Sequence, residues 1–251
     1  MWSLLALFAM PVVSMEAGEP VPPDWALKAW ADDIERLMGP VDLGEDGVEL
    51  TLSWQAGLPD RLDVAGEAEQ DEIHITLEGQ GWQHDTEKAR RVLRQNLAHE
   101  ISHVPQLRRL DTAFEPLILH EGFAEAQSLE LLIRAKLWTA ADARRARLGF
   151  EQRCLGALRE GPLLPQIEAG ERDAVYACGA VLVLAAADTA RTTPESLHRS
   201  YAKAAINPAG LGPWAKAALG EDFTRSALRF VTTDFSGGPT AAIEGLRAGR
   251  L

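Results

Sequence analysis

Apolar residues recur along the chain with two periods, and the change from one to the other separates a strand-bearing part from a helical part. Residues 48–54 and 72–77 alternate apolar and polar side chains, as half-buried strands do, and residues 62–65 predict a shorter strand between them. Within 72–77 the apolar side chains at Ile73 and Ile75 share one face. His74 points away from that face, so we expect it to be solvated.

Most of the remaining chain has the apolar spacing of helices separated by Gly and Pro. The predicted helices cover residues 24–38, 86–104, 116–132, 139–160, 173–187, 194–206, 213–219, 221–231 and 239–248. Asp85 or Thr86 is expected to cap the second helix and Pro105 to end it, while Thr139 with Asp142 opens the fourth. Strands followed by helices, without a repeat or long linker, predict one α+β domain over residues 18–251 with a mostly helical C-terminal half.

The N-terminus differs from the rest. Residues 2–13 form an apolar run that is too short to cross a bilayer, and small residues follow at Ser14 and Ala17. We interpret residues 1–17 as a signal peptide cut near one of these positions, which predicts a secreted or periplasmic protein. No Lys or Arg precedes the run, and an apolar helix packed on the domain is the alternative. We expect no other segment to span a membrane.

The amino-acid composition and net charge limit the classes of partner that the protein can bind. The chain has 251 residues, is 46% hydrophobic and carries a net charge of −12, which is ordinary for a globular protein and disfavours binding to nucleic acid or anionic membranes. Cys154 and Cys178 could form a disulfide between two helices in an oxidising compartment, although a chance pair of cysteines is equally ordinary. Their spacing does not resemble a zinc clip.

The strongest chemical signal is the sequence HEISH at residues 99–103. On a helix His99 and His103 lie one turn apart on one face, so both imidazoles can reach a single metal ion, and Glu100 lies beside them to act as a base. Asn96 lies on the same polar face. A catalytic zinc needs a third protein ligand from elsewhere in the chain.

The next predicted helix supplies candidates for that ligand in LHEGFAE, residues 119–125. Glu121 is our choice. His120 is the competitor, but it points about 100° round the helix from Glu121, so the two are not expected to ligate together. Glu125, one turn on, is placed to hydrogen-bond a ligand histidine and fix its tautomer. The alternative is that Glu121 and Glu125 form a solvated helix face.

This motif pair resembles the gluzincin metallopeptidases, and most closely the zinc aminopeptidases related to alanyl aminopeptidase and leukotriene A4 hydrolase, in which HExxH is followed by NEGFAE. The resemblance implies a thermolysin-like zincin fold, with the small mixed sheet over the zinc helix and one zinc ion on His99, His103 and Glu121. The sequence from Tyr176 to Ala180 (YACGA) is similar to the family's Tyr-x-x-Gly-Ala, whose tyrosine stabilises the oxyanion.

The chain also departs from that family. The motif spacing is one residue shorter, the resemblance covers only about residues 66–184, and the chain has no room for the family's additional domains. The family's Gly-x-Met-Glu-Asn, whose glutamate grips the substrate's amino group, has only a weak counterpart at residues 66–70 (GEAEQ), which would place Glu69 in that role. Aminopeptidase specificity therefore does not follow.

These features predict zinc-dependent hydrolysis of a peptide or protein substrate. Glu100 would take a proton from the water that zinc activates and return it to the leaving amine, and Tyr176 would hold the oxyanion. If residues 72–77 lie at the sheet edge above the site, that strand, with Ile73 and Ile75, would bind an extended substrate. Two alternatives remain, which are a non-catalytic zinc-binding or scaffold protein of the cell envelope and a helical binding module with an accidental motif.

Overall fold

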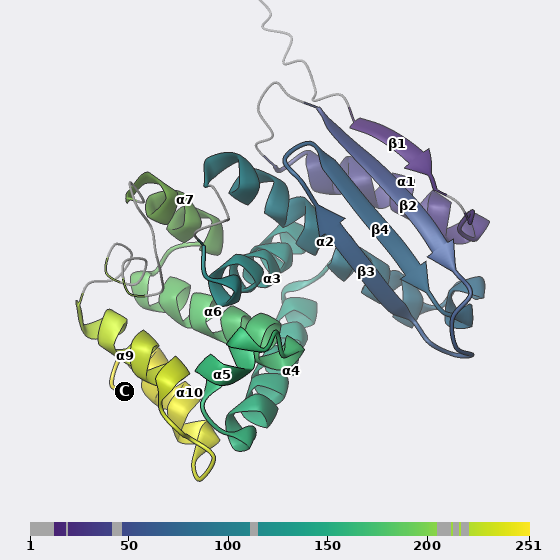
Figure 1. Cartoon of the computed structure of the whole chain (residues 1–251). Coiled ribbons are helices and arrows are strands. Elements are labelled where there is room, and N and C mark those ends of the chain that lie inside the picture. Colours follow the sequence, from purple (N-terminus) through teal and green to yellow (C-terminus); the bar gives the residue numbers. More distant parts are fainter. Residues whose placement is uncertain are drawn as a thin grey trace, which may run out of the picture.

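The computed structural model describes residues 13–18, 20–41, 47–110, 115–204 and 221–251, together with residues 212 and 216. In these residues a small sheet packs on helices of the first half, and the second half is helical (Figure 1). The α+β class, the mixed sheet over the motif helix and the helical C-terminal half are therefore confirmed.

The sheet has four strands, β1 (Val13–Ala17), β2 (Val48–Gln55), β3 (Asp63–Ala68) and β4 (Glu72–Glu78), in the order β1-β2-β4-β3. β1, β2 and β4 are parallel, and β3 runs antiparallel to β4. Alternation decides which face is buried, because Leu50 pairs with Ile73, Leu52 pairs with Ile75 and all four side chains are at most 1% exposed. His74, on the other face of β4, is exposed as predicted.

The expectation that residues 72–77 form a substrate-binding edge is wrong. β4 is an interior strand, hydrogen-bonded to β2 on one side and to β3 on the other, so its backbone has no free edge. Ile73 and Ile75 are each 1% exposed in the core. The edge strand on this side is β3, because residues 63–68 fold back on β4 through the turn that precedes Glu72.

β1 was not predicted. It lies within the segment that we interpret as a signal peptide, yet it pairs along β2, and the backbone N–H of Gly18 donates to the carbonyl of Leu52 at 2.8 Å. Both expected cleavage positions, Ser14 and Ala17, fall inside this strand. The signal peptide stays a prediction, and residues 1–12 lie outside the described residues.

The helices follow the predicted apolar periods closely. They are α1 (Asp24–Met38), α2 (Glu87–Arg109), α3 (Leu117–Arg134), α4 (Ala140–Glu160), α5 (Leu163–Glu168), α6 (Cys178–Ala190), α7 (Pro194–Ala204), α9 (Glu221–Thr232) and α10 (Pro239–Arg247). A 3₁₀ turn, η1 (Gln80–Gln83), precedes α2, and a π-helical turn, η3 (Asp173–Ala177), precedes α6. Thr86 caps α2, and Thr139 and Asp142 form the predicted capping box of α4. The helix expected at residues 213–219 lies, apart from residue 216, outside the described residues.

Pro105 does not end α2, which continues to Arg109. A proline inside a helix removes one backbone hydrogen bond. Here Val104, Pro105 and Gln106 are all buried, so packing against neighbouring elements outweighs that loss and keeps the last turn helical.

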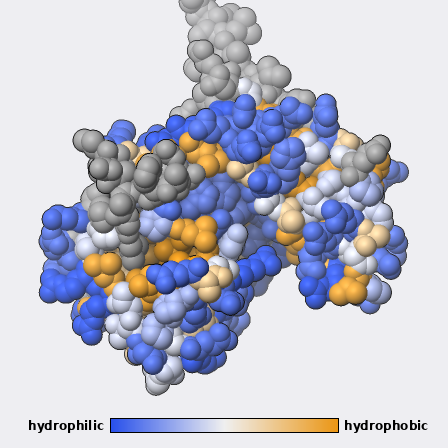
Figure 2. All heavy atoms as spheres, viewed as in Figure 1, coloured by the Kyte–Doolittle hydropathy of each residue, from blue (hydrophilic) through white to orange (hydrophobic). Residues whose placement is uncertain are grey.

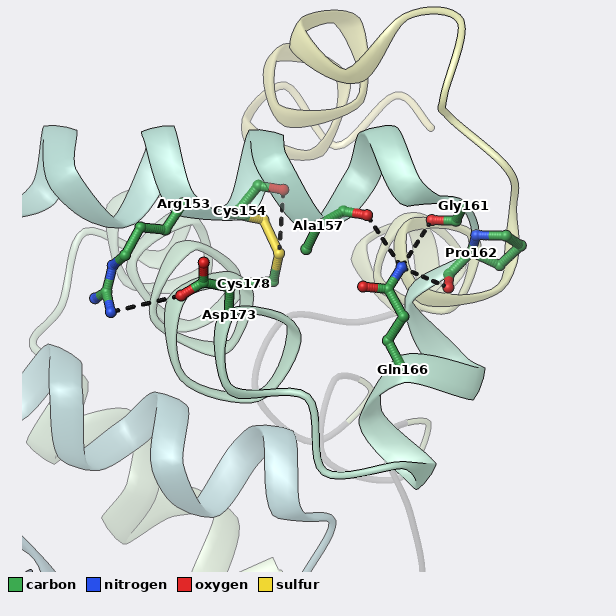
Figure 3. The surroundings of a disulfide bond; sticks show 8 residues. All are labelled: Arg153, Cys154, Ala157, Gly161, Pro162, Gln166, Asp173 and Cys178. Carbon is green, nitrogen blue, oxygen red and sulfur yellow. Dashed lines mark hydrogen bonds and ion pairs between the residues drawn. A yellow bond between two sulfur atoms is a disulfide. The ribbon is translucent and has the colours of Figure 1, made fainter. Parts of the chain in front are cut away.

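The most apolar segment is the core of the helical half. Residues Asp173–Ala190 form an 18-residue helical run with mean hydropathy 1.4, which corrects our expectation that no internal segment could span a membrane by length and composition, but 72% of the run is buried inside the protein. Cys178, the first residue of α6, is bonded to Cys154 of α4, so the open question of the disulfide is settled in favour of the bond (Figure 3). The bond ties α4 to the junction of η3 and α6.

Candidate metal centre

Three ligand atoms from two helices converge at one point. His99 and His103 project from one face of α2, and their Nε2 atoms are 3.0 Å apart. Glu121 projects from α3 and brings Oε2 to 3.2 Å from His99 Nε2 and 3.4 Å from His103 Nε2. All three residues are buried, with at most 9% of their surface exposed. The structure thus assembles the predicted ligand set from residues 22 positions apart.

The spacing of these atoms fits zinc. A tetrahedral zinc ion with ligand bonds of about 2.0–2.1 Å places its ligand atoms roughly 3.3 Å apart, close to the three distances above. Two imidazole nitrogens and one carboxylate oxygen are also the donor set of many catalytic zinc sites, which keep a further position for water. The residues present therefore fit the ion that the sequence predicts.

The two histidines and the glutamate of this cluster shift one another's pKa values. Burial lowers the pKa of His103 to about 4, whereas contacts with Glu121 and Glu125 outweigh burial and raise the pKa of His99 to about 10. Hydrogen bonds from both histidines likewise outweigh burial at Glu121 and hold its pKa well below the usual range. His99 thus carries the positive charge that the carboxylate requires. A bound cation would take over that charge and release the proton.

Glu100 lies beside the ligands and directly under β3. It is 7% exposed, and burial, opposed by His99, raises its pKa to about 7. A Cβ placed on Gly66 of β3 would lie 2.1 Å from Glu100 Oε1 and 2.8 Å from its Cγ. Only glycine therefore lets the edge strand pass so close to this carboxyl group.

The side chains that contact the outer ring nitrogens of His99 and His103 are partly those predicted. Glu125 approaches His99 Nδ1 with its Oε2 at 3.8 Å, as an ion pair. His103 instead has Gln106, whose Oε1 lies 3.2 Å from Nδ1. Asn96 does not reach a ligand, because its amide donates to the carbonyl of Val92 at 2.8 Å within the same helix. Gln106 was missed, although its place three residues after His103 is a usable signal.

His120 remains close to the site. Its ring stacks on His103 with centroids 4.3 Å apart, and its Nδ1 lies 3.1 Å from Glu115 Oε2. His103, His120 and Glu121 form a second group whose ligand atoms lie within 4.8 Å of one another. The 4.8 Å separation is looser than the distances of 3.0–3.4 Å between the ligand atoms of His99, His103 and Glu121. We therefore retain Glu121 with the two histidines of α2 as the ligand set.

Tyr176 reaches the site from the π-helical turn η3. Its ring stacks on His99 with centroids 5.8 Å apart, and burial, aided by Glu121 and Glu100, raises its pKa to about 12, so the phenol keeps its proton. The widened π turn precedes a close crossing of α6 over α3, where a Cβ on Gly179 would lie 2.4 Å from the carbonyl oxygen of Ile118. This crossing holds Tyr176 beside the ligands.

A cavity of about 640 Å³ opens over His99 and Glu100. Its walls come from β3 (Val64, Ala65, Gly66), α2 (Val92, Gln95, Asn96), α3 (Glu125), α4 (Ala146, Gly149, Phe150, Arg153) and the η3 region (Arg172, Tyr176). Figure 2 shows the molecule hollowed between the side that carries the sheet and the side that carries the C-terminal helices, with hydrophilic residues in the hollow.

The structure changes which residues are assigned to the cavity. Glu69 is exposed in the turn between β3 and β4 and does not line it. Arg153 and Arg172 do line it and were not singled out from the sequence, because nothing local distinguishes them from other surface arginines. Their pattern emerges only when α4 and η3 are packed together.

No protein-family model matches this chain, and no curated protein sequence matches it. The candidate metal centre therefore stands on its own residues and geometry.

Proposed function

We propose that the chain is a zinc-dependent peptidase of the gluzincin type with a thermolysin-like zincin fold. The observation that carries the proposal is the convergence of ligand atoms from His99, His103 and Glu121 within 3.4 Å of one another. His99 also lines a cavity, together with Glu100 and Tyr176. A mixed sheet over the ligand helix, with its antiparallel edge strand bordering the cavity, supports the same assignment.

His99, His103 and Glu121 would hold a zinc ion, which would supply a Lewis acid for the attacking water and the carbonyl of the substrate. Glu100, on the cavity side of the ligands, accepts the proton of the attacking water and passes it to the leaving amine. The protonated phenol of Tyr176 donates a hydrogen bond to the oxygen on which negative charge develops. The carboxylate of Glu125 orients the His99 ring through Nδ1.

The size of the cavity favours an enzyme over a protein that only stores or is stabilised by zinc. Structural zinc sites are closed by four protein ligands, whereas here His99 and Glu100 face about 640 Å³ of open space. Within the described residues β3 pairs with β4 alone, and it borders this space, so it offers backbone groups for an extended peptide. A peptide is therefore the substrate class that we propose.

The secreted or periplasmic location remains part of the proposal. The disulfide between Cys154 and Cys178 supports it, because such bonds persist in oxidising compartments.

The test has two stages. Elemental analysis of tag-free protein should find about one zinc per chain in the wild type and sharply less in Glu121→Ala, whereas Glu130→Ala, a control on the same helix, should keep its zinc. Hydrolysis of a peptide library should then fall roughly a hundredfold or more in Glu100→Gln with zinc retained. Absence of zinc even after it is supplied would refute the proposal, and wild-type turnover in Glu100→Gln would remove Glu100 from the mechanism.

A further inference from the structure

Two arginines stand on one wall of the cavity. Arg153 comes from α4, and Arg172 immediately precedes the π-helical turn that carries Tyr176. Both side chains are solvent-accessible where they meet the cavity. The protein as a whole carries a net charge of −12, so two arginines lining one cavity run against its average composition.

The charges around these arginines leave them able to bind an anion. Arg153 has one ion-pair contact, at 3.7 Å between its Nη1 and Asp173 Oδ1 (Figure 3). Its guanidinium group also lies over the ring of Phe150. Arg172 has no hydrogen-bond or ion-pair partner among the residues that the structure describes. The acidic residues that line the cavity, Glu100 and Glu125, lie at the metal end, beside His99.

Local structure determines the positions of Arg153 and Arg172. Arg172 is four residues before Tyr176, about one turn along the same helical segment, and Tyr176 stacks on His99. The disulfide to Cys178 holds α4, and with it Arg153, against that segment (Figure 3). The arginines therefore line the same cavity as β3, with Arg172 about one turn from Tyr176 on its segment.

We propose that Arg153 and Arg172 bind a carboxylate of the substrate, so that the enzyme prefers peptides with a negative charge close to the cleaved bond. The inference rests on the proposed peptidase function and names its substrate class. Guanidinium groups bind carboxylates through paired, charge-assisted hydrogen bonds. The carboxylate is either the peptide's C-terminus or an acidic side chain. An aminopeptidase would instead need an acidic group for the free amine, and Glu69 lies outside the cavity.

Binding to the inactive, zinc-loaded Glu100→Gln protein tests the proposal without turnover. The probes are one labelled peptide with a free C-terminus, the same peptide as its amide, and the amide with one residue changed from Gln to Glu. We expect at least one charged form to bind about tenfold or more tightly than the neutral amide, with the preference weakening at high salt. Whichever charged form wins identifies the source of the carboxylate.

Adding Arg172→Gln or Arg153→Gln to that protein should abolish the preference for charge with zinc content unchanged. Arg144→Gln, which removes an exposed arginine of α4 outside the cavity, should leave the preference intact. Equal affinity for charged and neutral peptides, or no binding of either, overturns the proposal. A preference that survives both cavity variants also overturns it, because the carboxylate would then be binding zinc.

The same peptides tested for cleavage by the wild type separate this proposal from the proposed function. A preference for charge that depends on the two arginines, without cleavage of any peptide, would refute peptidase activity and leave the carboxylate site standing. Cleavage of charged and neutral peptides with equal kcat/KM would keep the peptidase and refute the role of the arginines.

Discussion

Gly122 of α3 and Gly179 of α6 touch at their backbones, so that a Cβ on Gly122 would lie 2.5 Å from the carbonyl carbon of Gly179. Gly122 follows the proposed ligand Glu121, and Gly179 lies three residues after Tyr176. The contact thus sets how closely the helix with the third ligand approaches the segment with the proposed oxyanion donor. The geometry of the site depends on two residues that have no side chain.

Gly179→Ala should damage both stability and metal binding. Its Cβ would meet backbone atoms of α3, which cannot rotate away, so the helices must separate at a cost of roughly 1–3 kcal/mol or more in the free energy of unfolding. Urea denaturation and zinc titration measure the two effects. Gly156→Ala in α4, where no atom lies within 4 Å of the new Cβ, should be neutral or stabilising by up to about 1 kcal/mol. Equal stability of the two variants would contradict the tight crossing.

Gly66→Ala should reduce catalysis while keeping the zinc. The new methyl group would displace the carboxyl group of Glu100, which we propose as the base, and a small displacement of a reacting group is expected to lower kcat by about tenfold or more. Gly149→Ala is the matched control, since it also lines the cavity but has no atom within 4 Å of its Cβ. Unchanged kcat in Gly66→Ala, with the fold intact, would mean that the position of Glu100 is not critical.

Glu125→Gln should weaken zinc binding by about 10–100-fold. The carboxylate approaches His99 Nδ1 at 3.8 Å and increases the basicity of the ring, whereas an amide carries no charge. Competition with a chromophoric chelator measures the affinity. Glu130→Gln, on the same helix but away from the ligands, should leave it unchanged. If Glu125→Gln binds zinc with wild-type affinity, the orientation of the His99 ring depends on packing alone.

Removing the disulfide with Cys154→Ala and Cys178→Ala should cost about 3 kcal/mol of stability, from the loop of 24 residues that it closes. Because the bond also holds α4 against the segment that carries Tyr176, we expect kcat/KM to fall as well at temperatures where the variant is still folded. Chemical denaturation and peptide cleavage, each with and without reductant on the wild type, measure the two effects. A reductant that leaves wild-type stability unchanged would refute the stabilising role.

Local patterns gave most of the secondary structure and the core of the site. The two-residue alternation located β2 and β4, and the helical spacing of His99 and His103 placed both imidazoles on one face of α2. The cap at Thr139 and the buried helix after Asp173 were also evident, because these features depend on residues only a few positions apart.

Short-range patterns therefore suffice to single out the candidate metal ligands and the helices that carry them. That β3 and not β4 borders the site is visible only in the folded chain, since strand order depends on pairing between distant segments. The tertiary structure also brought Arg153 and Arg172 onto one cavity wall and placed Gly66 over Glu100. Such contacts join residues that are far apart in sequence, and no local period records them.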